Sequence, residues 1–237
     1  MKMSKNLPSL TLAKDLNIEF PENSKDLTEA ENAKIKNAII NGGALNSDGN
    51  TFIKKKKIGT LLACDNGGAN RVYNNLSDKD KLIFDNERYA SVSSILHAVS
   101  DRVQEPRDAI IREKLRQSEK GLIALRDSPT AEKTREIMKS RIEIALPNLK
   151  KDKIERDSLV NCQLSGEALE KDAHAHHVNR KSDNPRNALN LDDILVVNPD
   201  IHDEIHKNKA NTREELEELI KEKGWNNPYS SPSDKGN

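Results

Sequence analysis

The chain has little of what builds a large apolar core. Aromatic residues make up 3% of its 237 residues and hydrophobic residues 34%, whereas charged residues make up 33%. This composition excludes an extensive core and predicts a polar, helix-rich protein, some of whose segments order only when they meet a partner. No stretch approaches the roughly 18 apolar residues of a membrane-spanning helix, so we expect no contact with a membrane.

Cysteine is almost absent as well. Cys64 and Cys162 are the only two and lie far apart, which excludes a disulfide framework and makes a reducing compartment the default. The lysines at the N-terminus are not followed by the apolar segment of a signal peptide. We therefore expect a cytoplasmic protein, with export by a signal-independent machine as the alternative.

An excess of either charge is also missing overall, but the balance hides an asymmetry. Lys and Arg outnumber Asp and Glu by 28 to 22 in residues 1–153, and are outnumbered by 10 to 16 in residues 154–225. Any electrostatic attraction for nucleic acid would therefore come from the N-terminal part or from a bound metal ion.

The pattern along the chain predicts two folded parts between loose ends. We expect a flexible segment at 1–26, a mostly helical domain of unknown role at 27–153, a smaller module at 154–225 and a disordered tail at 226–237. The charged connector from Lys150 to Lys153 marks the boundary between the two parts. The predicted fold class is α+β, with a mostly helical N-terminal region followed by a small mixed module.

Apolar spacing predicts the elements of the N-terminal part. They are a helix from Leu27 to Ile40, one or two helices within 86–117 that Pro106 ends or kinks, and a helix from Pro129 that stops before Pro147. A small β element is expected from Thr51–Ile53 and Ile58–Ala63, with the run Lys54–Lys57 between them. Such a run is usually solvated, but it is also a candidate for contact with a nucleic-acid backbone.

Histidine is rare but concentrated. Five of the six histidines fall within 33 residues, at His174, His176, His177, His202 and His206. Histidine is the commonest side-chain metal ligand and the commonest general base near neutral pH. This concentration predicts a metal or catalytic site. The sixth, His97, lies among apolar residues and is expected to pack against a core.

The sequence around the five histidines predicts two strands and a helix. Asn198-Pro199 is a helix start, in which Asn198 would cap the free amides, and the helix would carry His202 and His206 on one face. Ile201 and Ile205 would anchor this helix to a core. Upstream, 173–178 and 194–197 are expected to be short strands, and neighbouring residues of a strand point to opposite faces. His176 and His177 would therefore face different sides.

Together these residues resemble the HNH endonucleases, a family with a ββα-metal fold, over about residues 155–225. The matching segments are Ala175-His176-His177-Val178 for the opening His-His, Asn190-Leu191 for the central Asn-Leu, Asn198-Pro199 through His202 to His206 for the closing Cys-Pro-x-Cys-His-x-x-x-His, and Cys162-Gln163-Leu164-Ser165-Gly166 for a Cys-x-x-Cys-Gly knuckle.

The resemblance implies a role for each matching residue. His176, His202 and His206 would hold one divalent ion, such as Mg²⁺, Mn²⁺, Ni²⁺ or Zn²⁺, and His177 would be the general base that activates water. Asn190 would orient the base or brace the loop, with Asn187 and Asp193 as alternatives because the spacing to His202 is longer than usual. The flanking cations would clamp phosphates or be solvated surface charges: Arg180, Lys181 and Arg186. His174 receives no role.

The departures from the family pattern concern its cysteines. Only Cys162 remains of the four in zinc-knuckle members, since Ser165, Asn198 and Ile201 take the other places. We therefore expect no second, structural zinc, and expect Cys162 to be a small buried residue.

The resemblance implies a metal-dependent endonuclease that hydrolyses DNA, in phage defence, restriction or a mobile element. RNA as the substrate is an alternative. So is a non-catalytic module in which the metal only stabilises a binding or assembly component. The N-terminal region would select the target, bind a protein partner or form a homo-oligomer.

Overall fold

The structure is a computed structural model that describes residues 9–183 and 185–229, apart from the side chain of Arg186. The chain folds as two compact units, Met1–Met138 and Lys139–Asn237. Most of the expected disordered tail lies outside the described residues, as do the first eight residues of the expected flexible segment. Within the described part of the chain, no helix has the length and apolar character required to cross a bilayer.

The first unit contains a five-stranded antiparallel sheet. Its strands are β1 (Leu10–Leu12), β2 (Gly43–Asn46), β3 (Thr51–Lys54), β4 (Lys81–Phe84) and β5 (Glu87–Ser91), in the order β1-β2-β3-β5-β4. Alternate residues of each strand face opposite sides, so Ile53 and Ala90 join the main core while Phe52 and Tyr89 form a smaller cluster on the other face.

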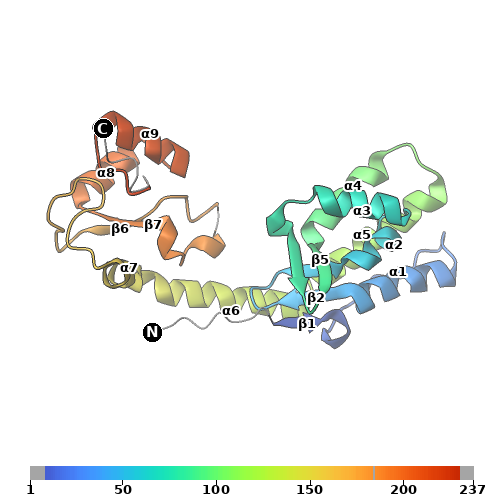
Figure 1. Cartoon of the computed structure of the whole chain (residues 1–237). Coiled ribbons are helices and arrows are strands. Elements are labelled where there is room, and N and C mark those ends of the chain that lie inside the picture. Colours follow the sequence, from blue (N-terminus) through green and yellow to red (C-terminus); the bar gives the residue numbers. More distant parts are fainter. Residues whose placement is uncertain (1–8, 184, 230–237) are drawn as a thin grey trace. The chain divides into compact units, whose positions relative to one another are not determined.

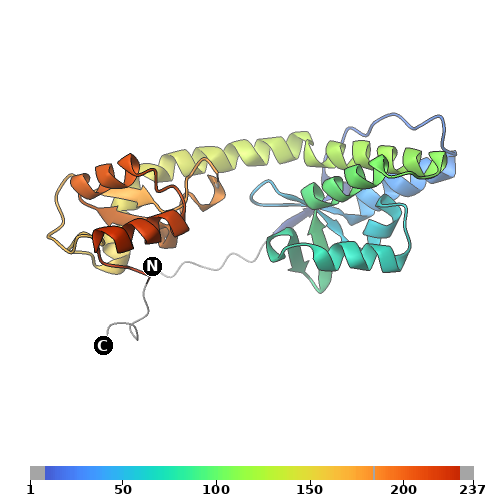
Figure 2. The same ribbon diagram turned by 90° about the horizontal axis from the view of Figure 1, so that it is seen from above.

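Among the described residues, five helices lie wholly in the first unit and pack mainly on one face of the sheet (Figures 1 and 2). They are α1 (Glu29–Gly42), α2 (Ile58–Leu61), α3 (Asn66–Asn75), α4 (Val92–Gln104) and α5 (Ala109–Arg126). The next helix, α6 (Pro129–Ala145), begins in this unit and continues past its last residue, Met138. The expected break near Pro106 is confirmed, because α4 ends and α5 begins on either side of it. The expected end of a helix before Pro147 is confirmed by α6.

Two expectations for this unit are wrong. Residues 58–63 are not a strand: α2 forms there because Ile58, Leu61 and Leu62 have helical spacing and are all fully buried. Residues 86–91 are not helical, since Asn86 lies in a turn and β5 occupies 87–91. Asp85 and Asn86 both adopt positive φ (48° and 57°) and make the two-residue turn of a β4–β5 hairpin. The N-terminal part is therefore a mixed α and β unit in which helices predominate, consistent with the expected α+β class.

The second unit is smaller and is built around two strands. Its elements are α7 (Leu149–Asp157), β6 (His174–His177), β7 (Ile194–Val197), α8 (Pro199–Lys207) and α9 (Arg213–Lys223). The strands are antiparallel, with His176 opposite Leu195. Helix α7 lies on one side of them and α8 and α9 lie on the other (Figure 1). The expected connector Lys150–Lys153 is part of α7, and Lys153 is buried there.

The core of the second unit lies between β7, α8 and α9. All four residues of β7 are buried, and the core includes Ile201 and Ile205 from α8 and Leu216 and Leu219 from α9. A capping box at Thr212 begins α9, and Gly224 ends it with a φ of 65°. The prediction of strand, loop, strand and helix over 173–206 is confirmed, with the first strand limited to His174–His177.

Candidate metal centre

Strand β6 points His176 toward α8. The ring of His176 lies 5.5 Å from that of His202 and 5.4 Å from that of His206, centroid to centroid, and meets both nearly at right angles. His177, the next residue, turns instead toward the loop before β7, where its ring contacts Ala188. The expectation that these two histidines face different sides is therefore confirmed.

Helix α8 supplies the other two rings. It begins at Pro199 as predicted, and buried Ile201 and Ile205 fix which face it turns to the core. His202 and His206 are one turn apart beside that face, with their Nε2 atoms 3.2 Å from each other. Their predicted place on a single helix face is confirmed.

Three imidazoles thus converge with a geometry that suits a metal ion. One ligand nitrogen from each of His176, His202 and His206 lies within 4.8 Å of the other two. Two nitrogens bound to one ion in tetrahedral geometry, each at about 2.0–2.1 Å, are roughly 3.3 Å apart. The 3.2 Å between His202 and His206 is close to that separation.

His176 also carries a polar atom that needs a partner. The residue is only 6% exposed, and its Nε2 atom makes no hydrogen bond among the described residues. A buried polar atom without a partner costs about 1–3 kcal/mol, unless another group satisfies it. A metal ion at the point where the three rings converge would accept this lone pair, so the chemistry of the donor set fits a divalent cation.

The electrostatics of the site favour neutral imidazoles. Burial, with the neighbouring rings of His202 and His206, lowers the pKa of His176 to about 4. Burial, followed by His206 and His174, also lowers the pKa of His202. Metal ions bind only deprotonated imidazole, so His176 and His202 are in their metal-binding form at neutral pH.

The low pKa of His176 predicts that the metal-free protein loses stability in acid. Because the folded-state value of about 4 lies below the usual 6.5, the unfolded chain binds more protons between these two values. The titration of His176 therefore leaves the free energy of unfolding unchanged above pH 6.5 and lowers it by about 3 kcal/mol as the pH drops to 4. Urea unfolding at pH 7 and pH 4.5, with chelator present, measures this loss in the unfolding transition of the second unit. His176→Leu should show a smaller loss than the wild type, and equal losses would contradict the prediction.

His177 is held in one tautomer. Its Nε2 atom lies 3.0 Å from the carbonyl oxygen of Ala188, which can only accept a hydrogen bond. Nε2 therefore carries the proton, and Nδ1 has no hydrogen-bond partner among the described residues. Sequence reasoning did not identify Ala188, because a contact through a backbone oxygen has no side-chain signal.

The three candidates for the central asparagine lie in two consecutive 3-10 turns, Pro185–Asn187 and Leu191–Asp193. The backbone N–H of Asn190 donates to the carbonyl of Asn187 (2.8 Å), and that of Asp193 donates to the carbonyl of Asn190 (2.9 Å). The side chain of Asn190 accepts from the N–H of Asp192 at 3.1 Å. Of the two roles expected for Asn190, this contact matches bracing the loop, and Asn190 makes no described hydrogen bond to His177.

Asn179 is a residue of this loop that sequence reasoning missed. Its amide donates to the Asp193 carboxylate at 2.7 Å, and its side-chain oxygen accepts from the N–H of Arg213 at 3.3 Å. It therefore ties the start and the end of the β6–β7 loop to α9. Only its position directly after Val178 at the end of the strand marked it in the sequence.

The knuckle-like segment keeps a tight turn through hydrogen bonds. Buried Cys162 accepts at Sγ from the N–H groups of Ser165 (3.4 Å) and Asn198 (3.5 Å), and Gly166 adopts a φ of 77°. The expected burial of Cys162 is confirmed. The other three knuckle positions supply a hydroxyl, an amide and the buried alkyl chain of Ile201, a donor set that does not suit zinc.

Asn198 does not cap α8 with its side chain, so that expectation is wrong. Its side chain instead donates to the carbonyl of Ala168 and accepts from the N–H of Glu170, both at 3.1 Å. Asn198 is buried, so both polar atoms of its side chain need partners. Two backbone groups of the preceding turn supply them, whereas capping the helix would engage only the side-chain oxygen. It thereby joins the knuckle segment to the start of the histidine helix.

The cations expected at the site are partly described. Arg180 and Lys181 are exposed and form no ion pair among the described residues, and the backbone N–H of Arg180 donates to Asn211 (3.1 Å), just beyond α8. This bond holds the backbone of Arg180 beside the segment that joins α8 to α9. The side chain of Arg186 lies outside the described residues.

The two remaining histidines differ in their surroundings. His174 stacks on His202 with ring centroids 4.5 Å apart and only 15° between planes, so it lies beside the three converging rings. His97 was expected to pack in a core, and this is wrong. Its side chain is 83% exposed and approaches Asp101, because the buried stripe of α4 is formed by Ile95, Leu96 and Val99.

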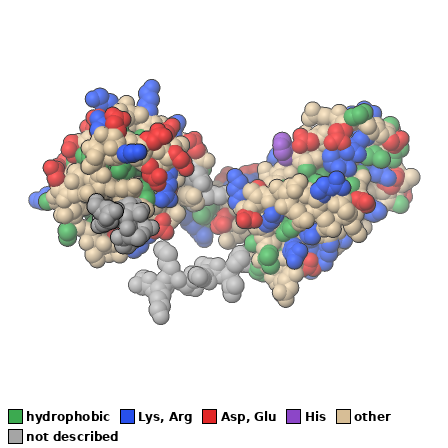
Figure 3. All heavy atoms as spheres, turned by 45° about the horizontal axis from the view of Figure 1, so that its top comes forward, with side chains coloured by type: hydrophobic (Ala, Val, Ile, Leu, Met, Phe, Trp, Pro, Cys, Tyr) green, Lys and Arg blue, Asp and Glu red, His purple; other side chains and the backbone are tan. Residues whose placement is uncertain are grey.

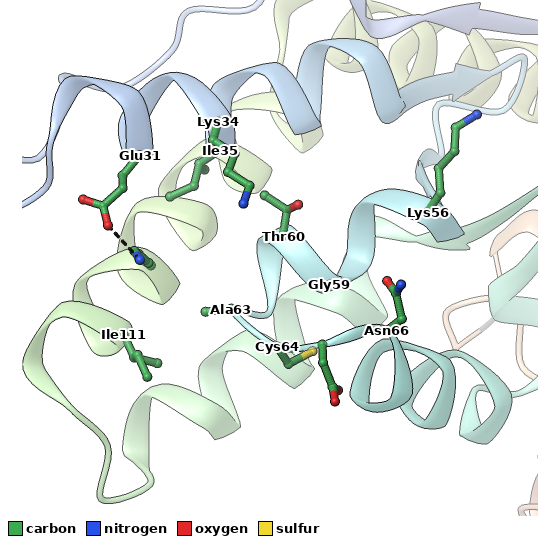
Figure 4. A pocket seen from close by; sticks show the side chains of 12 residues that line it. Glu31, Lys34, Ile35, Lys56, Gly59, Thr60, Ala63, Cys64, Asn66 and Ile111 are labelled. Atoms are coloured by element: carbon green, nitrogen blue, oxygen red, sulfur yellow. Dashed lines mark ion pairs between the residues drawn. The ribbon is translucent and has the colours of Figure 1, made fainter.

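A large cavity lies elsewhere, in the first unit. It measures about 820 Å³ and opens between α1, α2, the start of α3 and α5 (Figure 4). Lys34, Thr60 and Asn66 extend toward its centre, and Glu31 pairs with Lys114 at its edge. The three histidines form an open surface site instead, since His206 is exposed on α8.

Comparisons with protein-family models, with curated proteins and with solved structures found no match for this chain.

Proposed function

We propose that the chain is a metal-dependent endonuclease of the HNH type that hydrolyses phosphodiester bonds in DNA. The observation that carries this proposal is the pairing of two features on adjacent residues. His176 points an unsatisfied nitrogen at two further imidazoles, and His177 presents an Nδ1 without a described hydrogen-bond partner. A bound ion and a general base next to it are the two components that hydrolysis of a phosphodiester requires.

His176, His202 and His206 would hold the ion. A divalent metal bound there supplies Lewis acidity for the negative charge that develops on phosphate and leaving-group oxygens. Three protein ligands leave a coordination position open, as in catalytic rather than structural sites. The buried Ile201 and Ile205 keep two of the rings in place, so the ligands need little rearrangement on binding.

His177 would take the proton from the attacking water at Nδ1. As the ring becomes an imidazolium, its Nε2–H bond to the carbonyl of Ala188 strengthens and stabilises the positive charge. The turn that holds Ala188 is braced in part by Asn190. Asn190 would therefore be a positioning residue that acts through the loop rather than by touching the substrate.

Arg180 and Lys181 would contact the phosphate backbone. They follow the base by only a few residues, and no described acidic group neutralises them. By contrast, Arg213 is already paired with Glu217, and Arg156 with Asp157 and Asp192. Contacts of this kind orient the backbone without reading the base sequence.

One observation favours a second candidate, a structural metal module without catalysis. His174 stacks directly on His202, so a fourth imidazole is close enough to complete a closed site after a side-chain rotation. A closed four-ligand site would stabilise the second unit but leave no position for water or substrate.

Incubation of the purified chain with supercoiled plasmid distinguishes the two functions. We expect nicking in the presence of Mg²⁺, Mn²⁺, Ni²⁺ or Zn²⁺ and none after addition of a chelator. A parallel incubation with single-stranded RNA tests the alternative substrate. Tight metal binding without cleavage of either nucleic acid would favour the structural module and reject the nuclease.

A further inference from the structure

Lysine side chains lie around β5 on both faces of the sheet in the first unit. We call Lys55 and Lys81, whose ammonium groups approach the same ring, the lysine cluster. These groups lie 5.1 Å and 5.9 Å from the centre of the Tyr73 ring in α3. Lys54 lies 5.8 Å from the Tyr89 ring, on the other face of the sheet.

The sheet register explains how the cluster forms. Strand β5 lies between β3 and β4, and Lys54 is opposite Tyr89 while Lys81 is opposite Ala90. The chain then leaves β3 through the 3-10 turn Lys55–Lys57, which directly precedes α2. Arg88, opposite Ile83, lies on the same side of the sheet as Lys81 and has no described ion pair. It adds a third cation on the side of the sheet that carries the cluster.

Acidic groups balance the cluster only in part. Lys54 and Lys56, outside the cluster, share a single carboxylate oxygen of Glu87, at 3.5 Å and 2.5 Å. Lys81 has only the fully exposed Asp78, at 3.8 Å, and such exposed pairs contribute little. No described acidic group pairs with Lys55. Lys55, Lys81 and Arg88 thus present like charges on one side of the sheet, which is unfavourable unless an anion joins them.

The positions of the ammonium groups are largely set before binding. The side chain of Lys81 is only 24% exposed, and its ammonium group donates to the carbonyl oxygen of Asn74 at 3.2 Å. Lys55 is half-buried as well, so both alkyl stems pack against the protein while the charged ends stay at the surface. Little side-chain entropy would be lost when an anion binds. Tyr73 is buried beneath Lys55 and Lys81, so it is not available to stack on a base.

We propose that the lysine cluster is a second nucleic-acid contact surface, which holds the phosphate backbone of the DNA that the second unit cleaves. This inference rests on the proposed function for the identity of its ligand. The metal-site segment 154–225 has 16 acidic against 10 basic residues and so attracts DNA poorly. Figure 3 shows many acidic side chains on the face of that unit that it displays. A cationic surface on the first unit supplies the missing attraction, and because it offers no free aromatic ring it binds without sequence preference.

The test measures DNA binding without cleavage. The full chain is titrated with a fluorescent DNA duplex in chelator, and anisotropy is recorded over a range of salt concentrations. For the double variant Lys55→Gln/Lys81→Gln we expect roughly tenfold weaker binding, and a plot of log affinity against log salt that is shallower by about 1.8, the loss of two phosphate contacts. The control Lys120→Gln/Lys133→Gln removes the same charge from exposed positions of α5 and α6 and should change the slope little.

Each other outcome has a defined meaning. Equal effects of the two double variants would overturn the proposal, because net charge alone would explain them. Binding of anionic phospholipid vesicles that depends on the cluster, with DNA binding unchanged, would also overturn it and assign a membrane surface instead. Lys55→Arg/Lys81→Arg should restore binding if the first double variant is well folded. Because the binding test contains no metal, it can support the cluster even if the chain fails to nick plasmid. If the chain does nick plasmid but the salt dependence of the double variant is unchanged, only the role of the cluster is rejected and the nuclease assignment stands.

Discussion

Replacing His177 with alanine is expected to abolish plasmid cleavage while metal binding persists. The His177 side chain is not one of the three that converge on the metal position, although it is next to His176 in β6. Its Nε2 atom is hydrogen-bonded to the carbonyl of Ala188 on the opposite side of the strand. A positioned general base contributes about 100-fold to 10,000-fold to a rate. Nicking rates and calorimetric metal titration of the same preparations measure the two effects separately.

Two control variants make this result specific. His97→Ala removes an exposed histidine from the first unit, and we expect unchanged cleavage. His177→Gln keeps a hydrogen-bond donor for the Ala188 carbonyl but removes the base, so it should fold normally and remain inactive. Retained cleavage in His177→Ala would show that another group activates the water.

Replacing His202 with alanine is expected to remove both metal binding and cleavage. His202 is the most connected ring of the site: it lies 3.2 Å from His206 at Nε2, faces His176 edge to ring and stacks on His174. Loss of an indirect partner already weakens metal sites by about 10-fold to 100-fold, so loss of a ligand should exceed the upper end of that range.

Thermal unfolding gives a second measure of the same loss. At a free-metal concentration about 100 times the dissociation constant, a metal that binds only the folded state adds about 2.7 kcal/mol of stability. We expect this gain in the wild type and no gain in His202→Ala. Asp203→Ala is the matched control, because it changes the next, exposed residue of α8 and removes no ligand nitrogen. A metal-induced gain that is equal in His202→Ala and the wild type would reject the assignment of the ligands.

Local sequence patterns predicted the metal-site segment more accurately than the rest of the chain. The helix start at Asn198-Pro199, the spacing of His202 and His206 and the strand at 194–197 are all properties of neighbouring residues, and the structure has each of them. Proline at the first turn and an apolar stripe at helical spacing act within a few residues. Such signals are strong enough to place two ligands without knowledge of the partner strand.

The first unit was predicted less well because its sheet depends on distant contacts. Residues 58–62 are β-branched and apolar enough for a strand, but full burial of Ile58, Leu61 and Leu62 favours a helical turn there. Strand β5 pairs with β3, more than 30 residues earlier, and this pairing has no signal in the segment itself. His97 also depended on tertiary packing, because the way α4 packs decides which face of that helix is exposed.

By itself, the sequence determined the concentration of histidines, the helix that carries two of them, the alternation of His176 and His177 and the acidic character of residues 154–225. These features depend on composition and on periods of two and about four residues. The tertiary structure alone decided that the ring of His176 meets the other two, that Ala188 selects the tautomer of His177, and that Asn198 joins two segments instead of capping a helix. It also decided that Lys55, after β3, and Lys81, in β4, meet at the ring of Tyr73. Each of these is a contact between residues far apart in the chain, whose geometry is set by how the core packs.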